Sequence, residues 1–277
     1  MISLNIIPNR SLFALFFLIG FIGINTRLQA QSIDTLIDIG SYKLHFKIIK
    51  GKGTPVIFEA GGALNAEQWN YIANQIHKTL NIPVISYDRQ GFGRSGLDTA
   101  NYNILNEIIG FETGLQRLGY ANTNVVLVCH SLGAFYCRLY AARHPKQVKG
   151  IVMLDPRIPS YADIAFARDV FSSLDRKQFK YEDLSLYYVL AKMESNSNYI
   201  RLTPLPAHLP VLDIMADQGP FTSKKDNDRF KSDQRSFVKS NASRTLIFAK
   251  GSSHNIPHDK PEIVIAQILQ FYKRVTH

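Results

Sequence analysis

A serine marks the point where an apolar run of the sequence passes into a helix-forming stretch. Ser131 lies in the segment CHSLG (129–133), which follows the apolar residues 125–128 and precedes residues 134–143. The pattern is G-x-S-x-G with Cys129 in the first glycine position. A serine on a sharp turn between a strand and a helix holds its hydroxyl above the edge of a sheet, where it can act as a nucleophile. The alternative role for a serine here is an N-cap of the helix.

A histidine near the end of the chain is placed to serve that serine as a base. A serine hydroxyl needs a base to take its proton, and the base needs an acid to orient it. His254 follows the last apolar run, residues 246–249, in a loop rich in glycine and serine. His258 lies beside the next helix start, where a surface or capping role suits it, and His130 is expected to point away from Ser131. We therefore predict His254 as the base.

Two aspartates can orient that histidine, because each follows an apolar run that is predicted to be a strand. Asp155 comes directly after residues 151–154, and Asp217 follows the run that begins at residue 211. Asp155 precedes a long interval without strands, so it would be shielded from solvent and able to stabilise an imidazolium. Asp217 enters a Gln-Gly-Pro loop and serves equally well as a turn residue. We predict Asp155 as the acid, with Asp217 as the alternative.

A loop with two adjacent glycines follows the apolar residues 56–58 and reads EAGGAL (59–64). An acyl-transfer reaction needs two N–H donors for the oxyanion that forms in its transition state. The backbone N–H of Leu132, just after the serine, is one candidate. Glycine lets the backbone turn an N–H inward, so we place the second donor at Gly62, although a simple turn would use the same glycines.

The apolar runs alternate with stretches of helical length, which is typical of a parallel sheet covered on both faces. In such a sheet, chemistry lies outside the carboxyl ends of the strands. Period-two alternation over 42–48 also predicts a hairpin with an earlier strand at 33–39. We predict an α/β fold with a mostly parallel central sheet, helices on both faces and a small helical cap insertion at about 156–208. The predicted strands are 56–58, 84–87, 125–128, 151–154, 211–215 and 246–249, and the predicted helices include 66–80, 103–118, 132–144 and 260–274.

The composition is that of a globular protein, with 277 residues of which 45% are apolar and 19% are charged. These values exclude a disordered chain, a collagen and a coiled coil. The net charge of +10 comes from scattered residues, so no nucleic-acid partner is expected. The sequence holds no metal-ligand cluster, phosphate loop or dinucleotide fingerprint, and we expect neither metal nor cofactor. Cys129 and Cys137 are expected to be buried as small apolar residues.

The first thirty residues have the pattern of a secretory signal. Residues 11–24 carry no charge, Arg10 precedes them, and a small residue, Ala30, ends the segment. We predict a signal peptide at 1–30, one folded domain at 31–277, and a periplasmic or secreted protein; an uncleaved N-terminal anchor is the alternative. No later segment is long and apolar enough to cross a bilayer, so no stable membrane anchor is expected after removal of the leader.

The order of these elements and their motifs resembles the α/β-hydrolase superfamily, in its serine esterase and lipase-like branch. The segment DRQGFGRS (88–95) is similar to the family's D-R-x-G-x-G-x-S, and residues 59–62 to its oxyanion loop. The terminal pattern H-x-x-x-x-D-x-P-E is matched by residues 254–262, and the resemblance spans about 33–275. It implies an α/β-hydrolase fold, with Ser131 as nucleophile, His254 as base and an acid at either Asp155 or Asp217, and a purely structural part for Asp88.

Together these observations predict a serine hydrolase that cleaves a carboxylic ester or similar acyl bond through an acyl-enzyme. Epoxide and haloalkane hydrolases of this fold use an aspartate where Ser131 stands, which argues against both activities. The alternatives are a ligand-binding protein without activity, or a hydrolase of amide, lactone or carbon–carbon bonds. The expected partner is a small-molecule substrate with an apolar acyl group. Aromatic residues of the insertion would line its pocket or form the insertion's own core: Tyr161, Phe166, Phe171, Tyr187 and Tyr188.

Overall fold

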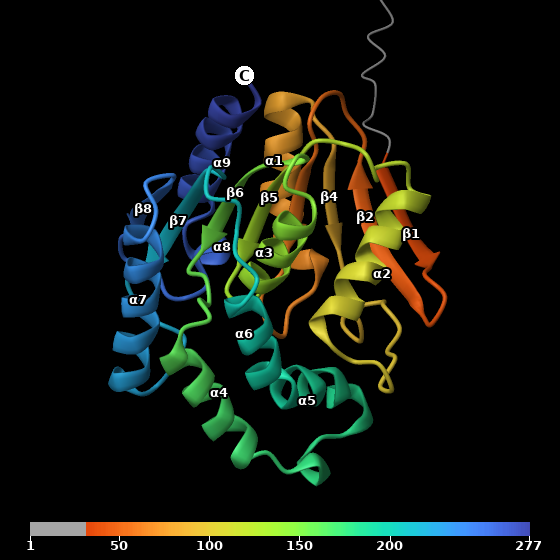
Figure 1. Ribbon diagram of the computed structural model, residues 1–277. Helices are drawn as coiled ribbons and strands as arrows, with labels where there is room; N and C mark the ends of the chain where they lie inside the picture. Colours follow the sequence, from red (N-terminus) through yellow and green to blue (C-terminus); the bar gives the residue numbers. More distant parts are fainter. Residues whose placement is uncertain (1–31) are drawn as a thin grey trace, which may run out of the picture.

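The computed structural model describes residues 32–277, in which eight strands form one sheet (Figure 1). The strand order is β1-β2-β4-β3-β5-β6-β7-β8. The pairs β1–β2 and β2–β4 are antiparallel, and all other pairs are parallel. The predicted leader, residues 1–30, lies outside the described residues. Within 32–277, no helix is long and apolar enough to span a membrane. The strands are β1 (Ser32–Asp38), β2 (Lys43–Ile49), β3 (Val56–Glu59), β4 (Val84–Tyr87), β5 (Val125–His130), β6 (Val148–Leu154), β7 (Val211–Ala216) and β8 (Arg244–Ala249).

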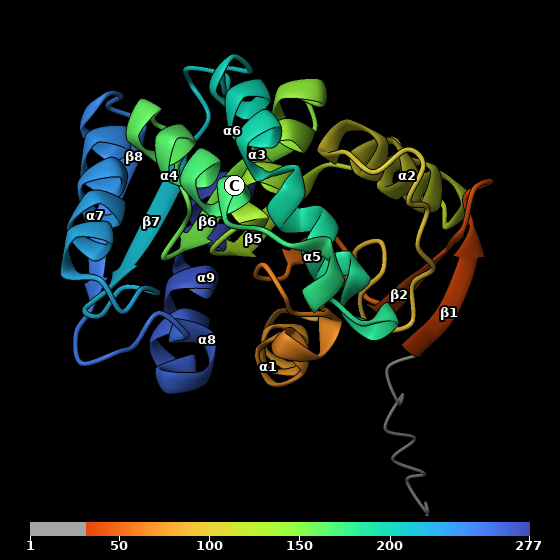
Figure 2. The ribbon, with the colours of Figure 1, turned by 90° about the horizontal axis from the view of Figure 1, so that it is seen from below.

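The central strands are apolar throughout because helices cover both faces of the sheet. Every residue of β5 is buried, and its side chains alternate between two cores. Leu127 joins the core on the side of α2 (Ile104–Arg117) and α3 (Gly133–Arg143). Val128 joins the core on the side of α1 (Asn70–Leu80) and α9 (Pro261–Thr276). Figure 2 shows these two layers on opposite sides of the strands. The predicted α/β fold is therefore confirmed.

The helices follow the connections between strands. Four of them match the predicted helical stretches within a few residues. α7 was not predicted; Phe237 from this helix joins the core on the α2 and α3 side. The remaining helices are η1 (Ala66–Trp69), α1 (Asn70–Leu80), α4 (Tyr161–Ser172), η2 (Arg176–Gln178), η3 (Tyr181–Asp183), α5 (Leu184–Ala191), α6 (Met193–Arg201), α7 (Lys224–Lys239), α8 (Ile256–Asp259) and α9 (Pro261–Thr276).

The interval between β6 and β7 folds into α4, α5 and α6, which lie at the carboxyl edge of the parallel strands (Figure 1). We call residues 156–208 the cap. Its aromatic residues divide between two roles. Tyr161 and Phe171 are exposed, whereas Tyr188 stacks on Tyr102 at 5.4 Å between ring centroids. Phe166 packs on Phe221, at 4.8 Å between centroids, beside the site described next.

Candidate functional site

Ser131 occupies a strained turn between β5 and α3. Its φ of +52° lies in the left-handed region that few residues other than glycine adopt. The turn is held by its backbone: the N–H of Ser131 donates to the carbonyl of Leu154, and its carbonyl accepts from the N–H of Arg157, both at 3.0 Å. The N-cap position of α3 belongs to Leu132 and carries no side-chain hydrogen bond. The serine side chain is therefore no helix cap, and it stands at a position that costs backbone strain.

The turn at Ser131, which we call the elbow, is compact because small residues flank the serine. A Cβ atom on Gly133 would lie 2.6 Å from the carbonyl oxygen of Ala60, so α3 approaches β3 too closely for any larger residue. Cys129 takes the other flanking position and is fully buried. A thiol is thus tolerated where the usual pattern has glycine. Cys137 is buried in the same core, and burial raises the pKa of its thiol.

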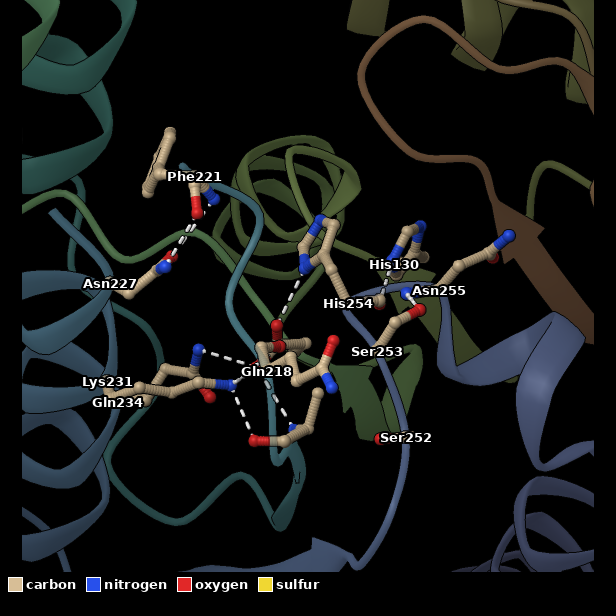
Figure 3. Close-up of polar contacts among 12 residues, drawn as sticks. His130, Gln218, Phe221, Asn227, Lys231, Gln234, Ser252, Ser253, His254 and Asn255 are labelled. Atoms are coloured by element: carbon tan, nitrogen blue, oxygen red, sulfur yellow. Dashed lines mark hydrogen bonds and ion pairs between the residues drawn. The ribbon is translucent and has the colours of Figure 1, made fainter. Parts of the chain in front are cut away.

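His254 and Asp155, which are 99 residues apart in sequence, are joined by a hydrogen bond (Figure 3). The imidazole Nδ1 lies 2.6 Å from Oδ2 of the carboxylate. Asp155 leaves β6 with a φ of +41° and donates its N–H to the carbonyl of Ile214, at 2.8 Å. The other predicted acid, Asp217, is exposed and accepts the N–H of Gly251 instead. The structure therefore pairs His254 with the favoured aspartate of the two.

The second oxygen of Asp155 is held by groups that sequence reasoning missed. Oδ1 accepts from Nζ of Lys231 at 2.8 Å, from Nε2 of Gln234 at 3.0 Å and from the N–H of Ala216 at 3.2 Å. Burial alone would raise the pKa of the carboxyl, but the hydrogen bond from His254 and the positive charge of Lys231 hold that pKa below its ordinary value. Asp155 is therefore a buried carboxylate that remains charged.

His130 connects the loop 59–64, which we call the glycine loop, to the loop that carries His254. One ring nitrogen, Nε2, lies 2.9 Å from the backbone carbonyl of His254, and Nδ1 lies 2.8 Å from Nε2 of Gln68. Burial, together with the nearby imidazole of His254, lowers the pKa of His130 to about 3. The ring is therefore uncharged at neutral pH, donates to the carbonyl of His254 and accepts from Gln68. Gln68 in turn accepts the N–H of Gly61, at 2.9 Å, so His130 connects the glycine loop to the loop of His254.

Arg89 fixes the backbone of the glycine loop, residues 59–64, through hydrogen bonds to its carbonyl groups. Its guanidinium is fully buried and pairs with Glu59, the last residue of β3. It also donates to three consecutive carbonyls, those of Ala60 at 2.6 Å, of Gly61, and of Gly62 at 2.9 Å. Because these carbonyls all turn towards Arg89, the course of the loop past the serine is fixed by a charged group.

The two predicted N–H donors lie next to each other. A Cβ atom on Gly62 would lie 3.8 Å from the Cβ of Leu132, which follows the serine. In the hydrogen-bond network of residues 32–277, neither backbone amide donates to another protein group. Neither N–H group is therefore bound to an acceptor in the described part of the chain, as the prediction of two oxyanion donors requires.

Alanine at Gly61 should lower stability much more than alanine at Gly62. A Cβ on Gly61 would lie 2.6 Å from Nδ1 of His130, so Gly61→Ala displaces the ring and lowers the free energy of unfolding by about 1–3 kcal/mol. Gly62→Ala meets only ordinary contacts and is its matched control, with a change below about 1 kcal/mol. Denaturant unfolding of both variants measures the difference. Equal effects would contradict the tight packing of His130 against this loop.

The surroundings of the site include an open cavity but no metal-binding cluster within residues 32–277. The cavity, of about 680 Å³, lies beside the glycine loop and the loop of His254 and is lined by Leu64, Gln68, Tyr71, Asn255 and His258 among others. On the opposite side, the ring of Phe230 lies 5.7 Å from that of His254. The arrangement offers a hydroxyl, an imidazole bonded to a carboxylate, and two free N–H groups at one sheet edge.

Comparisons with known proteins agree with this architecture. The model of the alpha/beta hydrolase family matches residues 56–267. The uncharacterized protein YqjL of Bacillus subtilis is 26% identical over 239 residues, which cover 86% of this chain and 91% of that protein. An epoxide hydrolase mutant from Vigna radiata superimposes with a TM-score of 0.68 at 15% identity, over 88% and 99% of the two chains. A thermophilic esterase from Thermogutta terrifontis does so with a TM-score of 0.62 at 16% identity, over 90% and 100%.

Proposed function

Because the chain belongs to the alpha/beta hydrolase family, we propose that it is a serine hydrolase that cleaves a carboxylic ester or similar acyl bond. The observation that carries this proposal is the hydrogen bond between His254 and the buried carboxylate of Asp155, at the same sheet edge as the strained turn of Ser131. An imidazole held by a charged acid has the tautomer that a general base needs, with its free nitrogen able to accept a proton.

In the proposed reaction, Oγ of Ser131 attacks the carbonyl carbon of the substrate while its proton moves to Nε2 of His254. The carbonyl oxygen becomes an oxyanion and accepts hydrogen bonds from the N–H groups of Leu132 and Gly62. Asp155 stabilises the imidazolium by its negative charge. The carbon–oxygen bond to the leaving group then breaks, and His254 returns the proton to the departing alkoxide, which leaves as an alcohol.

Water completes the cycle by the same steps. It transfers a proton to His254 as it attacks the acyl carbon, and the second tetrahedral species collapses when the bond to Oγ of Ser131 breaks. Ser131 recovers its proton from His254, and the carboxylic acid leaves. We further propose that the acyl group is apolar, because a series of contacting aromatic rings, Phe230, Phe221 and Phe166, leads from His254 to helix α4 of the cap.

A fluorophosphonate probe tests the proposal, because this reagent labels only serines that a base activates. We expect rapid addition of one probe mass to the chain, mapped by peptide mass spectrometry to Ser131. The matched control is Ser253, a serine in the loop of His254 whose hydroxyl donates to Asp259 and which should stay unlabelled. A chain that is folded but unlabelled at Ser131 would contradict the enzymatic proposal and favour a ligand-binding protein.

A further inference from the structure

Lys231 is a buried lysine in direct contact with the proposed catalytic acid (Figure 3). Only 8% of the residue is exposed, and its Nζ donates to Oδ1 of Asp155 at 2.8 Å and to the carbonyl of Ala216 at 2.6 Å. Lysine is rarely buried unless it is paired, because its ammonium loses hydration. Lys231 and His254 thus bind different oxygens of the same carboxylate, Oδ1 and Oδ2, so the lysine is part of the proposed site.

A second acid near this lysine, Asp213, makes no hydrogen bond to it. Asp213 in β7 is fully buried, and within residues 32–277 neither of its carboxyl oxygens has a hydrogen-bond partner. Burial, reinforced by the negative charge of Asp155, raises the pKa of Asp213 well above its ordinary value. The surroundings of Asp213 therefore favour its neutral carboxyl, and the carboxylate that Lys231 contacts is that of Asp155.

We propose that Lys231 is a positioning residue of this site: it fixes the carboxylate of Asp155 towards His254, and its positive charge opposes the charge that the imidazole gains when it takes up a second proton. This inference rests on the function proposed above. Its geometric part follows from the three donors on Oδ1, which leave Oδ2 to the imidazole. Its electrostatic part follows from charge. A carboxylate favours a protonated imidazole, and an ammonium on the same carboxylate opposes it.

The other groups around the histidine leave this effect to Lys231. His130 from the end of β5 is uncharged at neutral pH, because its pKa is lowered to about 3, and burial favours the neutral form of Asp213 from β7 by raising its pKa. Gln234, on the same face of α7, contributes a hydrogen bond without charge. Within the described residues, Lys231 is therefore the cation in contact with the pair formed by His254 and Asp155.

The test measures the rate of fluorophosphonate labelling of Ser131 between about pH 5 and pH 9, the range in which histidine titrates. In Lys231→Met, we expect the acidic limb of the profile to move to higher pH by about one unit, because the imidazolium loses an opposing charge. Lys231→Arg should keep the limb near its original place. Lys225→Met is the matched control: it removes one exposed charge from the same helix and should leave the limb unchanged.

Two further variants separate charge from hydrogen bonding. Gln234→Leu removes a donor to Asp155 but no charge, so we expect slower labelling with an unmoved limb. If Lys231→Met does not fold, the double variant Lys231→Met with Asp213→Asn removes the lysine together with its buried neighbour, and the same shift is expected. A limb that stays in place or moves to lower pH in the folded variant overturns the proposal.

A second readout keeps this result apart from the fate of the enzymatic proposal. NMR titration of the imidazole of His254 follows its protonation without any turnover, and Lys231→Met should move the midpoint to higher pH by the same amount. If the wild-type protein is labelled at Ser131 but the midpoint of His254 is unchanged in Lys231→Met, the role of Lys231 is refuted and the hydrolase proposal stands. An unlabelled wild-type chain with a moved midpoint would refute the hydrolase and leave the electrostatic effect standing.

Discussion

Replacement of Ser131 by alanine is expected to abolish ester hydrolysis and leave the fold intact. Loss of the attacking oxygen removes the acyl-enzyme route, so kcat should fall by about 100,000-fold or more. Stability should change little, because the hydroxyl caps no helix and the backbone bonds of the turn to Leu154 and Arg157 do not involve it. Hydrolysis of nitrophenyl esters of several acyl chain lengths, together with thermal unfolding of both proteins, measures the two expectations.

The two measurements guard against different errors. If the serine were a cap after all, its loss would lower stability by about 1 kcal/mol, and the melting temperature would fall with it. If the variant kept full activity, Ser131 would not be the nucleophile and the proposed mechanism would fail. Retained folding with lost turnover is the combination that the structure leads us to expect.

The second large effect is expected at Asp155, with Asp217 as its matched control. Asp155→Asn removes the charge that stabilises the imidazolium and turns a donor towards either His254 or Lys231, both of which already donate. The value of kcat should therefore fall roughly 10,000-fold. Asp217→Asn should stay within about twofold, because the amide oxygen can still accept the N–H of Gly251 at the exposed edge.

Steady-state kinetics of both variants with one ester decide between the acids. A large loss in Asp217→Asn with near-normal Asp155→Asn would show that the acid has been placed on the wrong strand. Comparable losses in both would contradict the assignment of Asp155 as the single acid.

Much of the fold was predictable because its elements carry local signals. Apolar runs such as 125–128 are buried on both faces of the sheet and show no alternation, whereas apolar and polar residues alternate over 42–48, although the polar His45 is also buried. The elbow was predictable for the same reason, because strand, small residue, serine, small residue and helix are adjacent in sequence.

α7 was missed because its charges hide its apolar face. Most residues of 224–239 are charged or polar, yet Phe230, Gln234 and Phe237 lie three to four residues apart and are all buried. That spacing was a usable signal of a helix face turned inwards. Lys231 lies beside Phe230 on that face, so the same signal would have marked it as a buried lysine that needs a partner.

The contacts of His130 and Arg89 could not be derived from sequence. His130 bonds to residues 62 positions before it and 124 positions after it, and Arg89 reaches carbonyls 27 to 29 positions away. No spacing rule links such positions, because the sheet order brings β3, β4 and β5 together out of sequence. For Asp155 and Asp217 the difficulty was similar, since both follow strands that end at the same edge.

The backbone bond between Arg157 and Ser131 limits how this scaffold can be diversified. Residues 154–157 carry the strand exit, the aspartate and the amide that fastens the serine turn, and the cap helices begin only at Tyr161. A chimera joined after Arg157 could exchange α4, α5 and α6 for those of a relative and keep the serine in place. A junction inside 154–157 would displace the serine turn and the aspartate together, so new substrate ranges are best sought by grafting beyond it.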